Sequence, residues 1–317
     1  MIPLQEIRAA RERVSGHVHR TPLYRNATLS HQLGSNVYLK LELFQKTGSF
    51  KPRGAFNQLL VLLAESGADR VVGASGGNFA QGLAYAGSTL GVATTIVMAE
   101  GTPAHYVEAT RGYGAEVEFA PTVAEAFERV DELAADGAIA AHPFDHPAMM
   151  AGNGTLGLEV VEDVPDITDI FISVGGGGFI TGVGSAIRAL RPDTRIWAVE
   201  TDGAQVMHES LSAGKPLTFT PTSLSRTIGS PYLSSVAYDF AVADVEDSLV
   251  VSDTEAYRAL QFLMERAKVV PELAASCTLA ALRAQAARFG PSNHVVLVLC
   301  GGNVSTDDLA LYRERLA

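Results

Sequence analysis

The chain has few of the residues that mark disulfide-rich, zinc-binding or membrane-spanning proteins. It contains only two cysteines, Cys277 and Cys300, which make neither a zinc-ligand spacing nor a disulfide framework. It has no run of about 18 uncharged apolar residues, so we expect no membrane span. Residues 1–14 carry charges throughout, so no secretory signal is expected. The expected compartment is therefore a reducing cytoplasm.

Excess positive charge is also missing. The 317 residues carry a net charge of −11 at pH 7, which argues against a general nucleic-acid or anionic-membrane surface but leaves room for one local anion pocket. Hydrophobic residues make up 47% and charged residues 19%, so the chain can bury a large core and is not expected to be disordered. At about 100–200 residues per domain, the length predicts two domains.

Short apolar runs alternate with helical stretches along most of the chain. Strands are predicted at 36–43, 70–75, 93–99, 115–120, 169–174, 195–200, 247–252 and 294–299. Helices are predicted at 54–66, 78–91 and 122–137, with further helical segments between the later strands. This alternation predicts an α/β fold with parallel, twisted sheets flanked by helices. Segment 201–248 has weak periodicity and is predicted to contain long, ligand-facing loops.

Two clusters of candidate site residues open predicted helices. Residues 47–55 place Lys51 at a strand-to-helix turn, with Pro52 near the helix start. Burial there would lower the pKa of the amine toward a usable range, although a solvated lysine is the commoner case. Residues 74–81 follow a strand, so their N–H groups and the Ser75 hydroxyl could cradle a carboxylate or phosphate. The alternative is an ordinary helix N-cap.

Two further clusters end later strands. One is a run of four glycines, Gly175, Gly176, Gly177 and Gly178. Such a backbone can wrap closely around a phosphate, and a flexible turn is the alternative. The run fits neither the dinucleotide fingerprint nor the P-loop pattern. In the other cluster, 298–303, Cys300 could face a bound ring or be a buried structural cysteine.

All four clusters lie at the carboxyl ends of predicted parallel strands, the edge at which open α/β sheets bind ligands. A lysine, a phosphate cradle, a carboxylate cradle and a ring contact together describe a pocket for a phosphorylated aldehyde and an amino acid. That combination indicates pyridoxal 5′-phosphate (PLP) chemistry.

In order and spacing, the clusters resemble the serine/threonine dehydratase–serine racemase family of fold-type II (tryptophan synthase β-like) PLP enzymes. The resemblance runs from Thr21 to Asn303. It implies a large PLP-binding domain made of 1–47 plus 146–317 and a small mobile domain, 48–145. It also implies a homodimer.

The resemblance assigns a role to each cluster. Lys51 resembles the lysine that holds PLP as a Schiff base and removes the substrate Cα proton, and Phe50 resembles the residue packed beside the cofactor ring. Cys300 matches the residue at the pyridine nitrogen, and the four glycines match the phosphate loop. Asn78 resembles the partner of the PLP 3′-oxygen. The implied substrate loop comprises Ser75, Gly76, Gly77 and Asn78.

Three departures from the family pattern bear on function. Gly76 stands where racemases have a serine that acts as a second base, and glycine has no proton to give. The optional divalent site of the family would use Glu200, the carbonyl of Ala204 and Val206; valine is no ligand, so no metal is predicted. Arg226 stands where an acidic residue is common. It suggests a substrate with a second acid, such as 3-hydroxyaspartate, although a solvated arginine is the commoner case.

The predicted reaction is PLP-dependent β-elimination of a 3-hydroxy amino acid, such as L-threonine or L-serine, to a 2-oxo acid and ammonia. A thiol is a poor proton source for the pyridine nitrogen, which favours prompt loss of a β-leaving group. Four alternatives stay open: an amino-acid racemase, a hydroxyaspartate- or phenylserine-type dehydratase, a β-replacement enzyme, and a PLP-binding protein without turnover. The expected partner is a small amino-acid substrate, with neither nucleic acid nor membrane.

Overall fold

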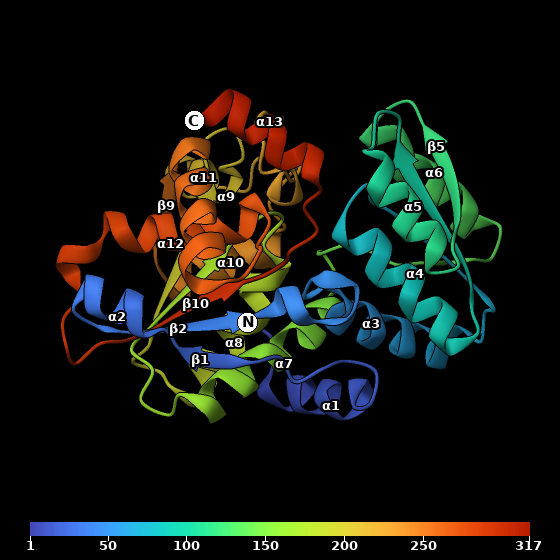
Figure 1. The fold of residues 1–317 in the computed structure, drawn as a ribbon. Helices are drawn as coiled ribbons and strands as arrows, with labels where there is room; N and C mark the ends of the chain where they lie inside the picture. The colour runs from blue at the N-terminus through green and yellow to red at the C-terminus, as the bar shows by residue number, and fades with distance from the viewer.

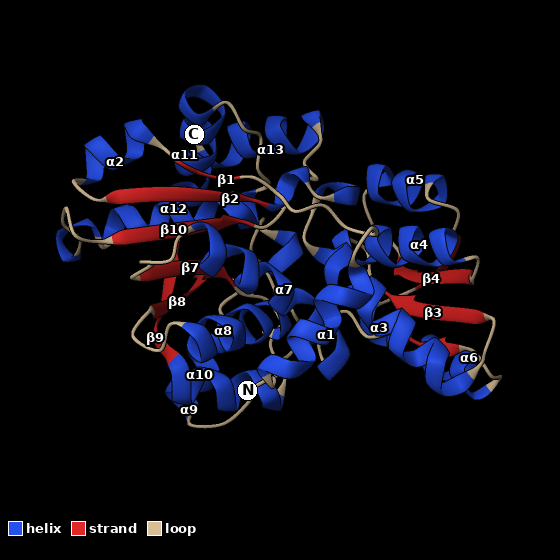
Figure 2. Cartoon of the chain, turned by 90° about the horizontal axis from the view of Figure 1, so that it is seen from below, coloured by secondary structure: helices blue, strands red, loops and turns tan.

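A computed structural model describes all residues, 1–317, as two lobes that meet in the middle of the molecule (Figure 1). Each lobe is built around its own sheet (Figure 2). The larger sheet has six strands in the order β1-β2-β10-β7-β8-β9, and the smaller has four in the order β5-β4-β3-β6. Every neighbouring pair is parallel except β1 and β2. The expected α/β class with parallel sheets is therefore confirmed.

The elements follow one another as an alternation of strands and helices. The strands are β1 (Leu23–Arg25), β2 (Asn36–Leu41), β3 (Arg70–Ala74), β4 (Ala93–Ala99), β5 (Glu116–Ala120), β6 (Ile139–Ala140), β7 (Asp169–Ser173), β8 (Arg195–Thr201), β9 (Val245–Val251) and β10 (His294–Leu299). The helices are α1 (Leu4–Val14), α2 (Ala27–Leu33), α3 (Lys51–Ser66), α4 (Asn78–Leu90), α5 (Ala104–Gly112), α6 (Val123–Ala135), α7 (Pro147–Asp163), α8 (Gly178–Leu190), α9 (Val206–Ala213), α10 (Ser235–Asp244), α11 (Asp253–Phe262), α12 (Leu273–Ala284) and α13 (Thr306–Leu316).

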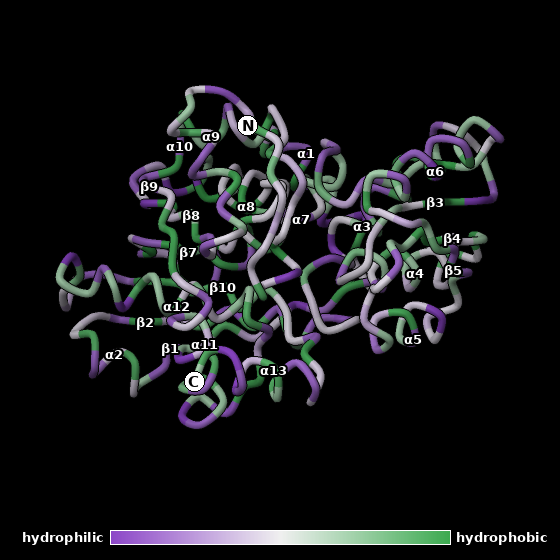
Figure 3. Tube along the Cα trace, turned by 90° about the horizontal axis from the view of Figure 1, so that it is seen from above, coloured by the Kyte–Doolittle hydropathy of each residue, from purple (hydrophilic) through white to green (hydrophobic).

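The larger sheet carries the main hydrophobic core. Strands β7 and β10 are buried along nearly their whole length, because parallel strands covered on both faces are apolar throughout. Helix α12 packs against β7, β8 and β10. In Figure 3 the trace is hydrophobic along strands of this sheet and hydrophilic at several outer turns.

All eight predicted strands form, with small differences at their ends. Strands β1 and β6 were not predicted, because they have three and two residues and are too short to show a pattern. The expectation of long loops in 201–248 was incomplete. Helices α9 and α10 lie in this segment, on either side of an irregular stretch, 214–234. Helices this short show too few turns for a clear period.

Helix α3 lies between the two lobes and packs against α7 (Figure 2). A buried ion network anchors its first turn. Arg53 Nε lies 2.8 Å from Glu42 Oε2, and Arg53 Nη1 lies 2.7 Å from Glu159 Oε1. Lys40 Nζ also pairs with Glu159, at 2.5 Å. These contacts fix the start of α3, and with it Lys51, against β2 and α7.

The division into two domains with boundaries near 48 and 145 stays a prediction. No helix of the structure is both long enough and apolar enough to cross a bilayer.

Candidate active site

Lys51 is the first residue of α3 and lies between the two lobes. Two short 3-10 turns lead from β2 into the helix, and Pro52 occupies its first turn, where a missing N–H costs nothing. The Lys51 Nζ donates a hydrogen bond to the Pro143 carbonyl at 2.7 Å. It lies 5.1 Å from the Phe50 ring centroid and 5.7 Å from that of Phe79. Burial lowers the pKa of the Lys51 amine from 10.5 to about 8.

Phe50 precedes Lys51 and closes one wall of this region. Its ring stacks on Phe179, with centroids 3.8 Å apart. Its backbone N–H donates to the Cys300 carbonyl at 3.0 Å. The predicted ring-contact residue is therefore locked between the end of β10 and the first turn of α8.

The four glycines connect β7 to the N-terminus of α8. Gly177 has a φ of 88°, in the left-handed region that favours glycine. A Cβ at Gly176 would collide with the Phe144 ring, and one at Gly177 with Ala237. The amides of Gly175, Gly176 and Gly177 donate to no protein acceptor. Free amide donors at the positive end of a helix fit a phosphate group.

The predicted substrate loop, Ser75 to Asn78, joins β3 to α4. The Gly77 amide donates to the Ser75 hydroxyl at 3.2 Å, whereas the Gly76 amide has no protein acceptor. A Cβ at Gly76 would lie 2.8 Å from the Thr102 hydroxyl oxygen. The place that a side chain at 76 would need is therefore filled by Thr102.

Asn78 belongs to a buried polar network that crosses from one lobe to the other. Its Nδ2 donates to both carboxylate oxygens of Glu272, at 3.0 and 3.1 Å. Its Oδ1 accepts from Asn303 Nδ2 at 2.7 Å, and the Thr227 hydroxyl donates to Glu272 at 2.9 Å. Burial raises the pKa of the Glu272 carboxyl, although these donors oppose the shift. Glu272 was not among the predicted site residues, and its partners come from distant segments of the chain.

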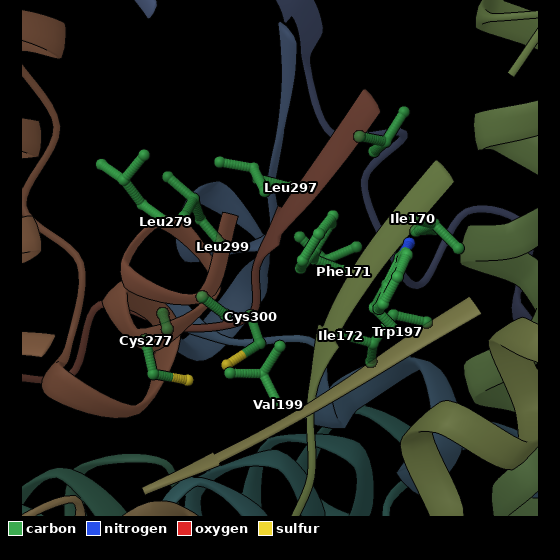
Figure 4. Packing of buried hydrophobic residues seen from close by; sticks show 14 of the residues in the cluster. Ile170, Phe171, Ile172, Trp197, Val199, Cys277, Leu279, Leu297, Leu299 and Cys300 are labelled. Atoms are coloured by element: carbon green, nitrogen blue, oxygen red, sulfur yellow. The ribbon is translucent and has the colours of Figure 1, made fainter. Parts of the chain in front are cut away.

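Cys300 follows β10 and lies beside Cys277 and Val199 (Figure 4). Both cysteines are free thiols. The Ser173 hydroxyl donates to Cys300 Sγ at 3.2 Å, and Glu272 Oε1 lies 4.0 Å from the same sulfur. Burial raises the pKa of the Cys300 thiol, so it stays protonated. Of the predicted site residues, Cys300, Phe50, Lys51 and Asn78 are connected directly or through Glu272.

The turn 142–145 is a part of the site that sequence reasoning missed. It carries the Pro143 carbonyl, which accepts from Lys51, and Phe144, whose ring covers Gly176. The Tyr232 hydroxyl contacts it from the irregular stretch 214–234. No local pattern in this turn indicates its contact with Tyr232.

Glu200, the first residue of the predicted absent metal site, caps α9. Its carboxylate accepts from the amides of Met207 and His208, each at 2.8 Å, and from the Ser248 hydroxyl at 3.0 Å. Val206 is buried. The oxygens of Glu200 are thus hydrogen-bonded within the chain, and the prediction that no metal binds here stays a prediction.

A two-lobed parallel α/β fold with a buried lysine, a free-amide glycine loop and a facing amide loop defines a class of PLP-binding enzymes. The family model "Pyridoxal-phosphate dependent enzyme" matches residues 14–301. The chain belongs to this family, and within it to the serine/threonine dehydratase–serine racemase group that its motifs resemble.

Individual relatives agree over nearly the whole chain. The L-threonine ammonia-lyase of Geobacter sulfurreducens is 38% identical over 99% of this chain and 79% of its own length. The L-threo-3-hydroxyaspartate ammonia-lyase of a Pseudomonas species is 36% identical over 95% of each chain. The solved structure of threonine deaminase isoform 2 from Solanum lycopersicum superposes with a TM-score of 0.92 at 30% identity, over 98% of this chain and 91% of that one.

Proposed function

We propose that the protein is a PLP-dependent ammonia-lyase that removes water and ammonia from a 3-hydroxy amino acid such as L-threonine or L-serine. The observation that carries the proposal is the buried Lys51 amine, whose pKa is lowered to about 8, in a site that also holds the free amides of Gly175, Gly176 and Gly177 and that of Gly76. An amine of this kind can act as both nucleophile and general base near neutral pH.

The two loops, Lys51 and Cys300 would have separate roles in this reaction. The amides of Gly175, Gly176 and Gly177 would hold the cofactor phosphate, and the loop from Ser75 to Asn78 the substrate carboxylate. Bound PLP supplies an electron sink that makes the substrate Cα proton acidic. Lys51 would then take that proton. The Cys300 thiol, protonated and buried, would leave the pyridine nitrogen without a strong proton donor.

A keto-acid release screen over hydroxy amino acids tests the reaction. Threonine or serine should yield a 2-oxo acid and ammonia, and Lys51→Ala should lower turnover by about 10³-fold or more. Lys46→Ala is the matched control, because Lys46 lies five residues away and bonds to the Tyr85 hydroxyl. Full activity in Lys51→Ala would refute the role of Lys51.

The same assay separates the remaining alternatives. A β-replacement enzyme would consume O-acetylserine and sulfide without releasing a keto acid. A racemase would form the D-isomer, and the missing side chain at Gly76 disfavours that outcome. A PLP-binding protein without turnover would show the cofactor absorbance band and release no product.

A second candidate substrate carries a distal carboxylate, as 3-hydroxyaspartate does. Arg226 makes no ion pair and lines a cavity of about 20 Å³ with Tyr106, Tyr312 and Asp308. Its neighbour Thr227 approaches the position of Gly77 in the substrate loop. The Pseudomonas relative is named for that substrate.

Relative turnover of threonine and threo-3-hydroxyaspartate tests this candidate. If Arg226 binds the second acid, Arg226→Gln should lower kcat/KM for hydroxyaspartate by about 10- to 100-fold and leave that for threonine within about 3-fold. A strong preference for threonine in the parent protein would refute 3-hydroxyaspartate as the substrate.

We further propose that the protein works in the cytoplasm as a homodimer. Two free, buried thiols suit a reducing compartment. Phe44 and Val270 expose 53% and 45% of their surface. Leu43, the neighbour of Phe44, and Val270 both lie close to Gly302, so Phe44 and Val270 offer apolar area for a partner subunit. Light scattering after size exclusion gives the mass in solution, and a monomer would rule out the dimer.

A further inference from the structure

The turn 142–145 is closed by its own histidine. The Nδ1 atom of His142 accepts from the backbone N–H of Phe144 at 3.3 Å and of Asp145 at 2.7 Å. Between these residues, the Pro143 carbonyl points at Lys51 and accepts from its Nζ at 2.7 Å. The direction of that carbonyl therefore depends on the His142 ring.

The hydrogen bonds also determine the protonation state of His142. Because Nδ1 accepts from two amides, its proton must lie on Nε2. Burial and the nearby charges of Lys51 and His146 lower the pKa of His142 to about 4, so the ring is neutral at pH 7. Nε2–H then donates to the Tyr232 hydroxyl oxygen at 3.1 Å. The Tyr232 O–H in turn donates to Asp145 Oδ2 at 3.3 Å.

Tyr232 is itself held by the lobe that carries the glycine loop. It forms an isolated antiparallel bridge with Thr218, and its carbonyl accepts from the Ser230 hydroxyl at 2.8 Å. Two residues later, the Ser234 amide donates to the Gly176 carbonyl at 3.4 Å. The Tyr232 ring packs on that of Phe144, with centroids 5.0 Å apart. The hydroxyl therefore joins the turn to the lobe that carries the glycine loop.

Helix α3 contacts the same turn at a second point. Gln58 lies seven residues after Lys51, on the same helical face. In the orientation that satisfies both groups, its amide bridges the N–H and the carbonyl of His142 at 3.1 Å each. The helix that carries Lys51 and the turn that receives its amine are thus held in fixed register.

We propose that Tyr232 and His142 are positioning residues that hold the Pro143 carbonyl where it receives the Lys51 ammonium. The inference rests on the proposed role of Lys51 as the base. A lysine that has taken a proton becomes an ammonium, and a carbonyl 2.7 Å away keeps it at the reaction centre. The other ionisable groups that act on Lys51 are Glu272 and Cys300, and neither touches Tyr232.

The test measures the titration of Lys51 in the full-length chain, freed of cofactor by hydroxylamine. Acetic anhydride modifies the neutral amine, and mass spectrometry of the Lys51 peptide gives the extent of modification at each pH. Tyr232→Phe keeps the ring and removes the two hydroxyl contacts. It should lower the apparent pKa of Lys51 by about 0.5 to 1, through partial loss of a charge-assisted hydrogen bond. The titration midpoint, unlike the rate, is independent of accessibility.

The matched control is Tyr238→Phe, because Tyr238 is half-buried on the following helix and should leave the midpoint unchanged. Hydrogen exchange of the Phe144 and Asp145 amides reports the turn directly and should be faster in Tyr232→Phe only. Unchanged exchange would show that Tyr232 does not hold the turn. Faster exchange with an unchanged Lys51 midpoint would show that the turn does not position the lysine. Either result overturns the proposal.

A double variant tests whether Tyr232 acts on the Pro143 carbonyl through His142. If Tyr232 acts through His142, adding Tyr232→Phe to His142→Ala should shift the Lys51 midpoint no further, because members of one network are not additive. Additive shifts would overturn the proposed pathway. These measurements need neither cofactor nor turnover. If Lys51→Ala is inactive but Tyr232→Phe leaves the Lys51 midpoint unchanged, this inference alone is wrong. If Lys51→Ala is active, the proposed function is wrong.

Discussion

Replacing Lys51 by methionine should make the cofactor-free protein more stable at pH 7. Burial lowers the pKa of the Lys51 amine from 10.5 to about 8, and each pH unit is worth about 1.4 kcal/mol. Keeping the ammonium in the folded state therefore costs about 3 kcal/mol at pH 7. The variant leaves the Pro143 carbonyl without its donor, which lowers the free energy of unfolding by about 1 kcal/mol. The expected net gain is about 2 kcal/mol in the free energy of unfolding.

The gain must depend on pH in a definite direction. Between pH 8 and 10.5 the unfolded chain binds the Lys51 proton more tightly than the folded one, so this group's contribution to stability rises with pH. Lys51→Met removes that dependence. Its advantage over the parent should be full below pH 8 and close to zero by pH 10.

Urea unfolding at pH 7 and pH 10 measures both values, provided that the slope of the transition stays the same. Lys215→Met is the control, because Lys215 is exposed and should change stability by less than about 0.5 kcal/mol. An equal effect of Lys51→Met at the two pH values, or a loss of stability at pH 7, would refute the assignment of Lys51 as a buried amine with a low pKa.

Three further substitutions probe the framework around the site by urea unfolding. Arg53→Ala should cost about 3–5 kcal/mol, because it leaves the buried Glu42 carboxylate without a cation and Glu159 with Lys40 alone; a cost below about 1 kcal/mol would contradict the buried network. Gly76→Ser should lower the free energy of unfolding, because the added side chain meets Thr102. The double variant Gly76→Ser with Thr102→Ala should recover at least half of that free energy. Gly177→Ala should cost about 1–3 kcal/mol more than Gly214→Ala, because both glycines have positive φ but only Gly177 has a neighbour in the way.

The fold could be predicted where the signal is local. Strands β4, β7 and β10 are mostly buried, so each is a largely apolar, β-branched run in the sequence, and its predicted ends differ from the structure by at most one residue. Strand β6 has two residues and pairs only with β3. Such an element exists because a neighbouring strand supplies its hydrogen bonds, and no property of its own residues marks it.

The same distinction between local signals and long-range contacts applies to the site residues. Lys51 and the four glycines could be predicted because each forms its geometry from consecutive residues at a helix start. Glu272 has no local signature, and its partners Asn78 and Thr227 lie 194 and 45 residues away. Tyr232 meets His142 across 90 residues. Contacts of this range depend on how the lobes pack, and a single sequence carries no record of them.

The ionisable groups around Lys51 favour elimination over racemisation. Burial raises the pKa of the Cys300 thiol and lowers that of His142 to about 4, so neither exchanges a proton readily near pH 7. Gly76 offers no group at all, and the Thr102 hydroxyl beside it donates to the Ala99 carbonyl at 2.7 Å. The Glu272 carboxylate, which also acts on Lys51, accepts hydrogen bonds from Asn78 and Thr227. Lys51 is therefore the base that we propose at Cα, and a single base would return a proton only to the face from which it took one. Serine recovered from partial turnover of L-serine in D₂O should therefore carry deuterium at Cα only in the L-isomer, as measured by chiral chromatography with mass detection. Deuterated D-serine formed at a rate near that of pyruvate would require a second base.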